Sequence, residues 1–142
     1  FYKIDYGFKY GQADILRVGN NGSVFVTGTP AGRALEAVER LREEGVFLQL
    51  VYVSCPLSLE RAVLESAAKT GIIFSIEDHN VHSGLGSCIA DRLAEEGLCA
   101  RLVKLGVGSY GVSGRPEDLY KRAGISSGAI VERIRHELQK ND

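Results

Sequence analysis

The chain has 142 residues, of which 44% are hydrophobic and 25% are charged, and its formal net charge is −1. This size and composition are typical of one soluble globular domain that can bury a core. The near-zero charge excludes the basic surface expected of a protein that binds nucleic acid or an anionic membrane. The longest apolar run, residues 46–53, is interrupted by Gln49 and is far too short to span a bilayer.

Three cysteines, Cys55, Cys88 and Cys99, are odd in number and lack C-x-x-C spacing. They predict reduced core thiols in a cytoplasmic protein, not a disulfide framework or a metal site. The chain contains no methionine and begins at Phe1, and no signal peptide is visible at its amino end. We therefore expect a processed chain or a piece of something larger.

Residues 1–12 place five aromatic side chains among lysines and predict an extended arm. Aromatic and basic residues together can stack nucleobases, but no wider basic surface accompanies them. The arm is therefore expected to pack on this domain or on a neighbouring one. Residues 13–18 predict the first strand, which ends at the turn 19–22.

Strands and helices are expected to alternate along the middle of the chain. Residues 23–27 predict a strand, and Thr29 with Pro30 is typical of a helix start, which leads to a helix that ends at Gly45. Residues 46–53 predict the most apolar strand, placed centrally in the sheet. Ser58 is expected to cap the next helix, which Gly71 ends.

In the second half, residues 99–107 alternate in polarity and indicate a strand at or near a sheet edge. A glycine-rich loop follows at 106–114, then a short helix at 116–123 and a final helix capped by Ser126. The order of elements predicts an α/β fold with right-handed crossovers, in which helices cover both faces of a largely parallel sheet.

Residues 71–93 are the most informative stretch. A buried strand at 72–76 is followed by polar side chains that we expect in an acidic turn, namely Glu77, Asp78 and His79. A glycine-rich loop then begins a helix, and its residues are Ser83, Gly84, Leu85, Gly86 and Ser87.

This loop is a candidate interface or anion-accepting site. In open α/β sheets, ligands gather where a strand's carboxyl end meets a helix's amino end, and free N–H groups attract anions there. The alternative is that Ser83 merely caps the helix, while Gly84 and Gly86 allow close packing on the strand, the commoner outcome for short glycine motifs. Asp78, His79 and His82 lack the spacing of a structural zinc site, so no metal is expected.

The same stretch resembles the carboxyl-terminal domain of transketolase-like, thiamine-diphosphate-dependent enzymes. Their pattern reads roughly E-[ED]-H…G-G-x-G-S-x-[IV]-A-[ED]-x-L, and Ser83 replaces its first glycine. The matching residues are Glu77, Asp78, His79, Gly84, Gly86, Ser87, Ile89, Ala90, Asp91 and Leu93. Segments 10–19, 24–41, 110–119 and 124–126 resemble other family segments in the same order.

The resemblance implies a three-layer α/β/α domain with a five-stranded mixed sheet, one strand of which is antiparallel. It implies that residues 1–142 form a carboxyl-terminal structural and dimerisation domain of an enzyme that transfers two-carbon ketol units between sugar phosphates. Thiamine diphosphate and a divalent metal would be held by other domains, because the G-D-G motif is absent here. No catalytic, cofactor-binding or metal-binding residue is assigned, and the chain alone is expected to be inactive.

Two alternatives remain. The domain could come from a deoxyxylulose-phosphate synthase or a 2-oxoacid dehydrogenase beta chain, or it could be a stand-alone module that binds an anion or nucleotide. For the family interpretation, the expected partners are the parent's catalytic domains, in the same chain or in a separate subunit, and a second copy. The aromatic arm and the loop 78–86, with Val81 and Leu85, are the expected exposed apolar contacts, so we predict weak self-association through that loop.

Overall fold

The computed structural model describes residues 6–140, so arm residues 1–5 lie outside the described residues. The middle layer is a sheet with the order β1-β3-β2-β4-β5. Its strands are β1 (Asp14–Arg17), β2 (Ser23–Val26), β3 (Gln49–Tyr52), β4 (Ile72–Asn80) and β5 (Arg101–Val107). Neighbours among β2 to β5 are parallel, and β1 is antiparallel to β3. The expected five-stranded mixed sheet is confirmed.

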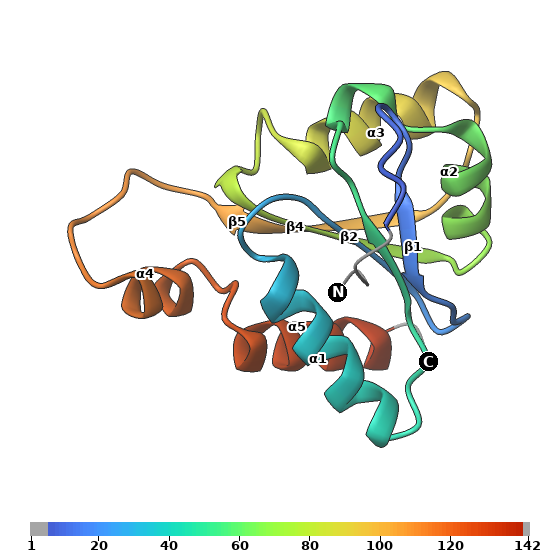
Figure 1. Cartoon of the computed structure of the whole chain (residues 1–142). Helices are drawn as coiled ribbons and strands as arrows, with labels where there is room; N and C mark the ends of the chain where they lie inside the picture. The colour runs from blue at the N-terminus through green and yellow to red at the C-terminus, as the bar shows by residue number, and fades with distance from the viewer. Residues whose placement is uncertain (1–5, 141–142) are drawn as a thin grey trace.

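Helices cover both faces of this sheet (Figure 1). One face carries α1 (Ala31–Glu43) and α5 (Ser127–Gln139), and the other carries α2 (Arg61–Ala68) and α3 (Leu85–Glu95). A 3-10 turn, η1 (Pro56–Ser58), precedes α2, and a short helix, α4 (Pro116–Arg122), precedes α5. Within residues 6–140, no helix has both the length and the apolar character needed to cross a membrane.

Alternation along the strands divides the core into two clusters. Val24 and Val26 of β2 pack under α1 and α5, whereas Phe25 points to α2 and α3. Phe74 and Ile73 of β4 divide between the two faces in the same way. Successive strand side chains point to opposite faces, and a strand buried on both faces therefore reads as a continuous apolar run.

The expected position and start of the third strand were wrong. β3 begins at Gln49, because residues 46–48 are irregular, and it lies between β1 and β2. The middle of the sheet is β2, whose four residues are all buried. The antiparallel β1 covers the outer edge of β3, which explains how a non-central strand is this apolar. The edge position expected for β5 is confirmed.

Helix starts follow the sequence signals only in part. Ser126 accepts a hydrogen bond from the Ala129 N–H at 3.4 Å, so the expected cap of α5 is confirmed. By contrast, Pro30 itself is the N-cap of α1, and no side chain caps it. Ser58 belongs to η1, and α2 begins only at Arg61. The proline-led 3-10 turn moves the cap of α2 from Ser58 to Glu60, about half a helical turn later.

A buried carboxylate attaches α5 to the edge of the sheet. The Glu137 side chain is 3% exposed and pairs with Arg101 of β5. Arg133 Nε lies 3.0 Å and Lys140 Nζ 3.5 Å from Glu137 Oε1. Burial by itself would raise the pKa of Glu137, but the hydrogen bond and charge of Arg101, with Lys140 and Arg133, lower that pKa below its ordinary value.

Candidate functional site

The stretch singled out in the sequence lies where the sheet changes direction. The chain passes from β2 through α1 to β3 on one side, whereas β4 lies on the other side of β2. The carboxyl ends of β2 and β4 therefore flank a topological switch point, where α/β folds commonly place a site. Thr27, Glu77 and His79 come together there, around a shallow pocket of about 230 Å³.

The expected acidic turn is instead the last part of a strand. β4 continues to Asn80, so Glu77, Asp78 and His79 are strand residues. Their exposure differs: Glu77 is 1% exposed, whereas Asp78 and His79 are exposed. The pairing of β4 with β5 is irregular between Ile76 and Asn80, so simple alternation does not describe all three residues. The turn itself comes after residue 80, where the Asn80 side-chain oxygen accepts the His82 N–H at 2.8 Å.

The buried Glu77 carboxylate caps α3. Its two oxygens accept the backbone N–H groups of Leu85, at 2.7 Å, and Gly86, at 2.9 Å. The first N–H groups of a helix have no partner within the helix, and an anion is favoured at this positive end. The expected cap Ser83 is wrong: the N-cap is Gly84, without a side-chain hydrogen bond, and Ser83 is exposed. The protein's own carboxylate therefore occupies the place predicted for an external anion.

The two glycines of the loop are explained by close packing. A Cβ atom at position 84 would lie 1.6 Å from Glu77 Oε2. A Cβ atom at position 86 would lie 2.5 Å from Ser75 Oγ and 2.8 Å from Lys104 Cγ. Real Cβ atoms do not approach other atoms so closely, so a larger residue would displace either the carboxylate or the strands. The packing interpretation of Gly84 and Gly86 accounts for both positions.

Lys104 was not identified as a site residue from the sequence. Its Nζ donates to Ser87 Oγ at 3.0 Å, and Ser87 Oγ donates to the backbone oxygen of Val81 at 3.4 Å. This chain of contacts joins β5, the first turn of α3 and the turn after β4. The sequence signal that could have identified Lys104 is a single lysine among the apolar residues of β5. The hydroxyl of Ser75, also buried at this position, has no hydrogen-bond partner.

Leu85 belongs to the core. It is 1% exposed and packs in the cluster under α2 and α3. The expectation that Leu85 forms an exposed apolar contact is therefore wrong, because the first residue of α3 points inward. Val81 is half-buried.

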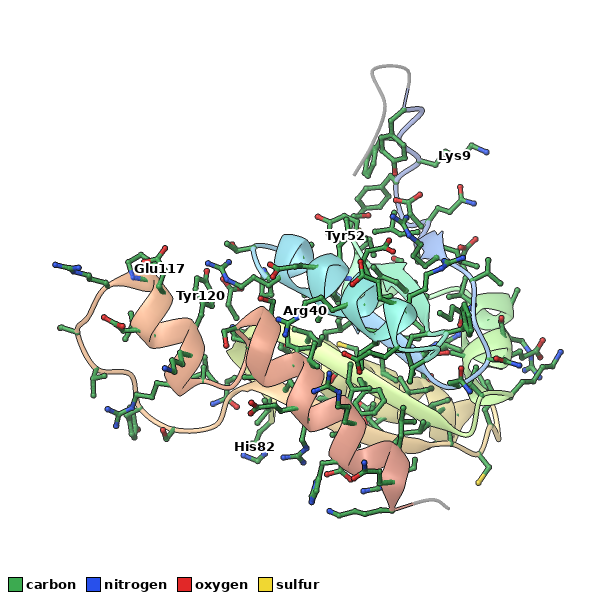
Figure 2. The ribbon with its side chains drawn as sticks, turned by 90° about the horizontal axis from the view of Figure 1, so that it is seen from below. Lys9, Arg40, Tyr52, His82, Glu117 and Tyr120 are labelled. Carbon is green, nitrogen blue, oxygen red and sulfur yellow. The ribbon has the colours of Figure 1, made fainter. Side chains whose placement is uncertain are left out.

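The exposed apolar side chains lie mostly at the carboxyl edge of the sheet. By the carboxyl edge we mean the end of the sheet at which its parallel strands finish. Six of the nine large exposed apolar side chains in the described range lie there, because they follow β3 or β5 or precede β1. β1 is antiparallel to β3, so it begins opposite the carboxyl end of β3. They are Tyr6, Phe8, Tyr10, Leu57, Tyr110 and Val112. Figure 2 shows the arm around Lys9 standing away from the body, beyond Tyr52.

The cysteines are free, as expected, but they are not core residues. Cys55 and Cys88 are partly buried, and Cys99 is exposed. Burial, with the nearby charges of Asp91 and Glu77, raises the pKa of the Cys88 thiol. A raised pKa disfavours the nucleophilic thiolate. Among residues 6–140, no three His, Cys, Asp or Glu side chains are grouped so that they could hold a metal ion.

Solved structures share this fold. The chain is similar to a structure described as "Split gene transketolase, inactive beta4 tetramer", with a TM-score of 0.86 and 28% identity over 97% of this chain and 46% of that one. A transketolase from Campylobacter jejuni matches with a TM-score of 0.67 at 22% identity, over 94% of this chain and 20% of that one, a likeness of fold alone.

Curated relatives are similar over nearly the whole chain. A protein named as a transketolase C-terminal section, from Methanocaldococcus jannaschii, is 28% identical over 94% of this chain and 42% of its own length. One of the subunits of the apulose-4-phosphate transketolase of Actinobacillus succinogenes is 30% identical over 90% and 42%. A 1-deoxy-D-xylulose-5-phosphate synthase of Chlorobium phaeovibrioides is 30% identical over 88% and 20%. The chain thus spans less than half the length of these relatives.

The model of the family described as "Transketolase, C-terminal domain" matches residues 11–130. That range includes all five strands, the Glu77 cap of α3 and both loop glycines. The chain therefore belongs to the transketolase C-terminal domain family.

Proposed function

We propose that residues 1–142 act as one carboxyl-terminal structural and dimerisation domain of a transketolase-like enzyme in the cytoplasm. The parent enzyme transfers two-carbon ketol units between sugar phosphates. Its other domains, in the same chain or in a separate subunit, hold thiamine diphosphate and a divalent metal. The free cysteines suit a reducing compartment.

One observation supports this role: six of the nine large exposed apolar side chains in the described range lie in segments that adjoin the carboxyl ends of β3 and β5. Leu57 is 90% exposed, Tyr10 82% and Tyr110 102%. Exposed apolar groups concentrated on one side of a domain are typical of a surface that another protein surface covers. The carboxyl edge, and not the loop 83–87 alone, is therefore our proposed contact with the catalytic domains and with a second copy.

The residues present do not suit the cofactor itself. A pyrophosphate needs free donors or a bound metal, but the start of α3 is filled by Glu77. Asp78 and His79 are exposed at the end of β4, and within the described part of the chain no further potential metal ligand joins them in a group of three. The capped helix start also argues against the stand-alone anion-binding module.

The reaction branch is proposed from the relatives. Two that are similar over 90% or more of the chain are named as a transketolase section and a transketolase subunit, and they are about as long as the split-gene chain. A deoxyxylulose-phosphate synthase has about the same sequence identity to this chain as those two relatives. The synthase branch, together with the 2-oxoacid dehydrogenase beta chains, is therefore the alternative.

The test is to reconstitute the chain with the polypeptide that supplies the catalytic domains, and to assay both with thiamine diphosphate and Mg²⁺. We expect ketol transfer between sugar phosphates only when both parts are present. Formation of 1-deoxy-D-xylulose-5-phosphate would instead indicate the synthase branch. Micromolar binding of thiamine diphosphate by this chain alone would overturn the support role.

The proposed contact is tested separately by sedimentation. Leu57→Ser at the carboxyl edge should weaken association with the catalytic part or with a second copy. Val18→Ser is the matched control, because Val18 is 78% exposed but follows β1 at the opposite end of the sheet. Equal effects of the two substitutions would exclude the carboxyl edge as the contact.

A further inference from the structure

The segment 108–123, which we call the α4 lobe, stands apart from the body of the molecule. Figure 1 shows its loop reaching out from the end of β5 and returning through α4. Residues 108–118 are all exposed, and α4 has no buried residue. A helix of seven residues is not stable by propensity alone, so α4 depends on its contacts with the body.

Those contacts centre on Tyr120. The guanidinium carbon of Arg33, on α1, lies 3.9 Å from the centre of the Tyr120 ring. The Tyr120 hydroxyl donates to Asp78 Oδ2, at the end of β4, at 3.3 Å. Figure 2 shows Tyr120 on the side of α4 that faces the body. One side chain thus joins the lobe both to the first helix and to the polar end of β4.

The rest of the attachment is loosely packed. Cavities of about 250 Å³ and 260 Å³ lie beside α4, and Val107, Leu119 and Ala123 line both. Tyr120 and Ala123 are the lobe residues that pack against the main core. Few other packing contacts are lost if the lobe moves, and segments with few buried contacts open first.

Both ends of the lobe are defined. Before it, the Val107 oxygen accepts the Val81 N–H at 3.1 Å. After it, Ser127 Oγ donates to Glu36 on α1 at 3.0 Å. Between these fixed points, a Cβ atom at Gly108 or Gly124 would meet no neighbour within 4 Å, so neither position is confined by packing.

We infer that the α4 lobe is a hinged strap, held shut by Tyr120 between Arg33 and Asp78, which opens while the sheet stays folded. Opening uncovers Ile125 and Val107, the apolar floor of the cavity next to Asp78. This inference does not rest on the proposed function.

Hydrogen–deuterium exchange of the whole chain tests it, because a released α4 melts and its amides exchange. Tyr120→Leu removes both polar contacts and retains apolar bulk, so peptides covering 116–123 should exchange about tenfold faster, with β4 and α1 unchanged. Arg33→Gln should produce part of that effect, and Tyr120→Phe, which retains the ring under Arg33, a smaller one. Tyr110→Leu is the matched control, since Tyr110 belongs to the same lobe but is fully exposed.

Three outcomes would overturn the strap. In the first, lobe exchange in Tyr120→Leu equals that of the unsubstituted chain. In the second, Tyr110→Leu accelerates exchange as much as Tyr120→Leu does. In the third, exchange in β4 rises together with that of the lobe, which would make α4 part of the global folding unit.

Discussion

Removing the Glu77 carboxylate should destabilise the whole domain. Glu77→Ala leaves the N–H groups of Leu85 and Gly86 without an acceptor in a buried setting. Each buried donor left unpaired costs about 1–3 kcal/mol, so two cost about 2–6 kcal/mol. Relief of the buried charge offsets part of this cost, and we expect a net loss of about 3 kcal/mol. That is a large fraction of the roughly 5–15 kcal/mol by which domains are stable.

Equilibrium unfolding in urea measures this loss as a lower midpoint with an unchanged slope. Glu77→Gln keeps one acceptor oxygen and should lose about half as much. Asp91→Ala removes an exposed carboxylate from the same helix and should change stability by no more than about 0.5 kcal/mol. A loss below about 1 kcal/mol for Glu77→Ala would show that water or another group can replace the cap.

Three further results are expected. Gly86→Ala should lower the melting temperature, with a loss of about 1–3 kcal/mol from overpacking. Gly32→Ala in α1 should raise it, because apart from the chain next to it and the backbone of its own helix nothing lies within 4 Å of the new methyl. A similar shift for both would contradict the packing account. Leu85→Asp should cost more than about 3 kcal/mol in urea unfolding, because it buries a charge in the core, and a folded variant that is merely less associated would be unexpected. The pKa of Glu137 is lowered on folding, so its carboxylate should stabilise the protein relative to Glu137→Gln. This difference in the free energy of unfolding should be full above pH 4.5, the ordinary pKa, and should shrink as the pH falls below it. Urea titrations at pH 7 and at successively lower pH check this, and a difference independent of pH would refute it.

Local patterns in the sequence were sufficient for the kinds of elements and their order. The apolar positions of α1, α3 and α5 recur with helical spacing, and the strands are short apolar runs bounded by turns, so the helices and strands could be located from the sequence. The resemblance added the antiparallel strand, β1, which periodicity does not reveal. These features depend on neighbours only a few residues apart along the chain.

Tertiary structure alone decided which strands are neighbours and what the polar residues after Ile76 do. The rank of β3 in the sheet depends on β1 pairing with its outer edge, a contact between residues more than thirty positions apart. Glu77 and Asp78 are both acidic residues, so the sequence alone does not show which of them is buried. Glu77 caps α3 because β4 continues past it and pleating turns its side chain inward, toward N–H groups eight and nine residues later. Whether a strand ends or continues depends on the strands that pair with it, so the sequence marked this site while only the fold determined that the protein's own carboxylate fills it.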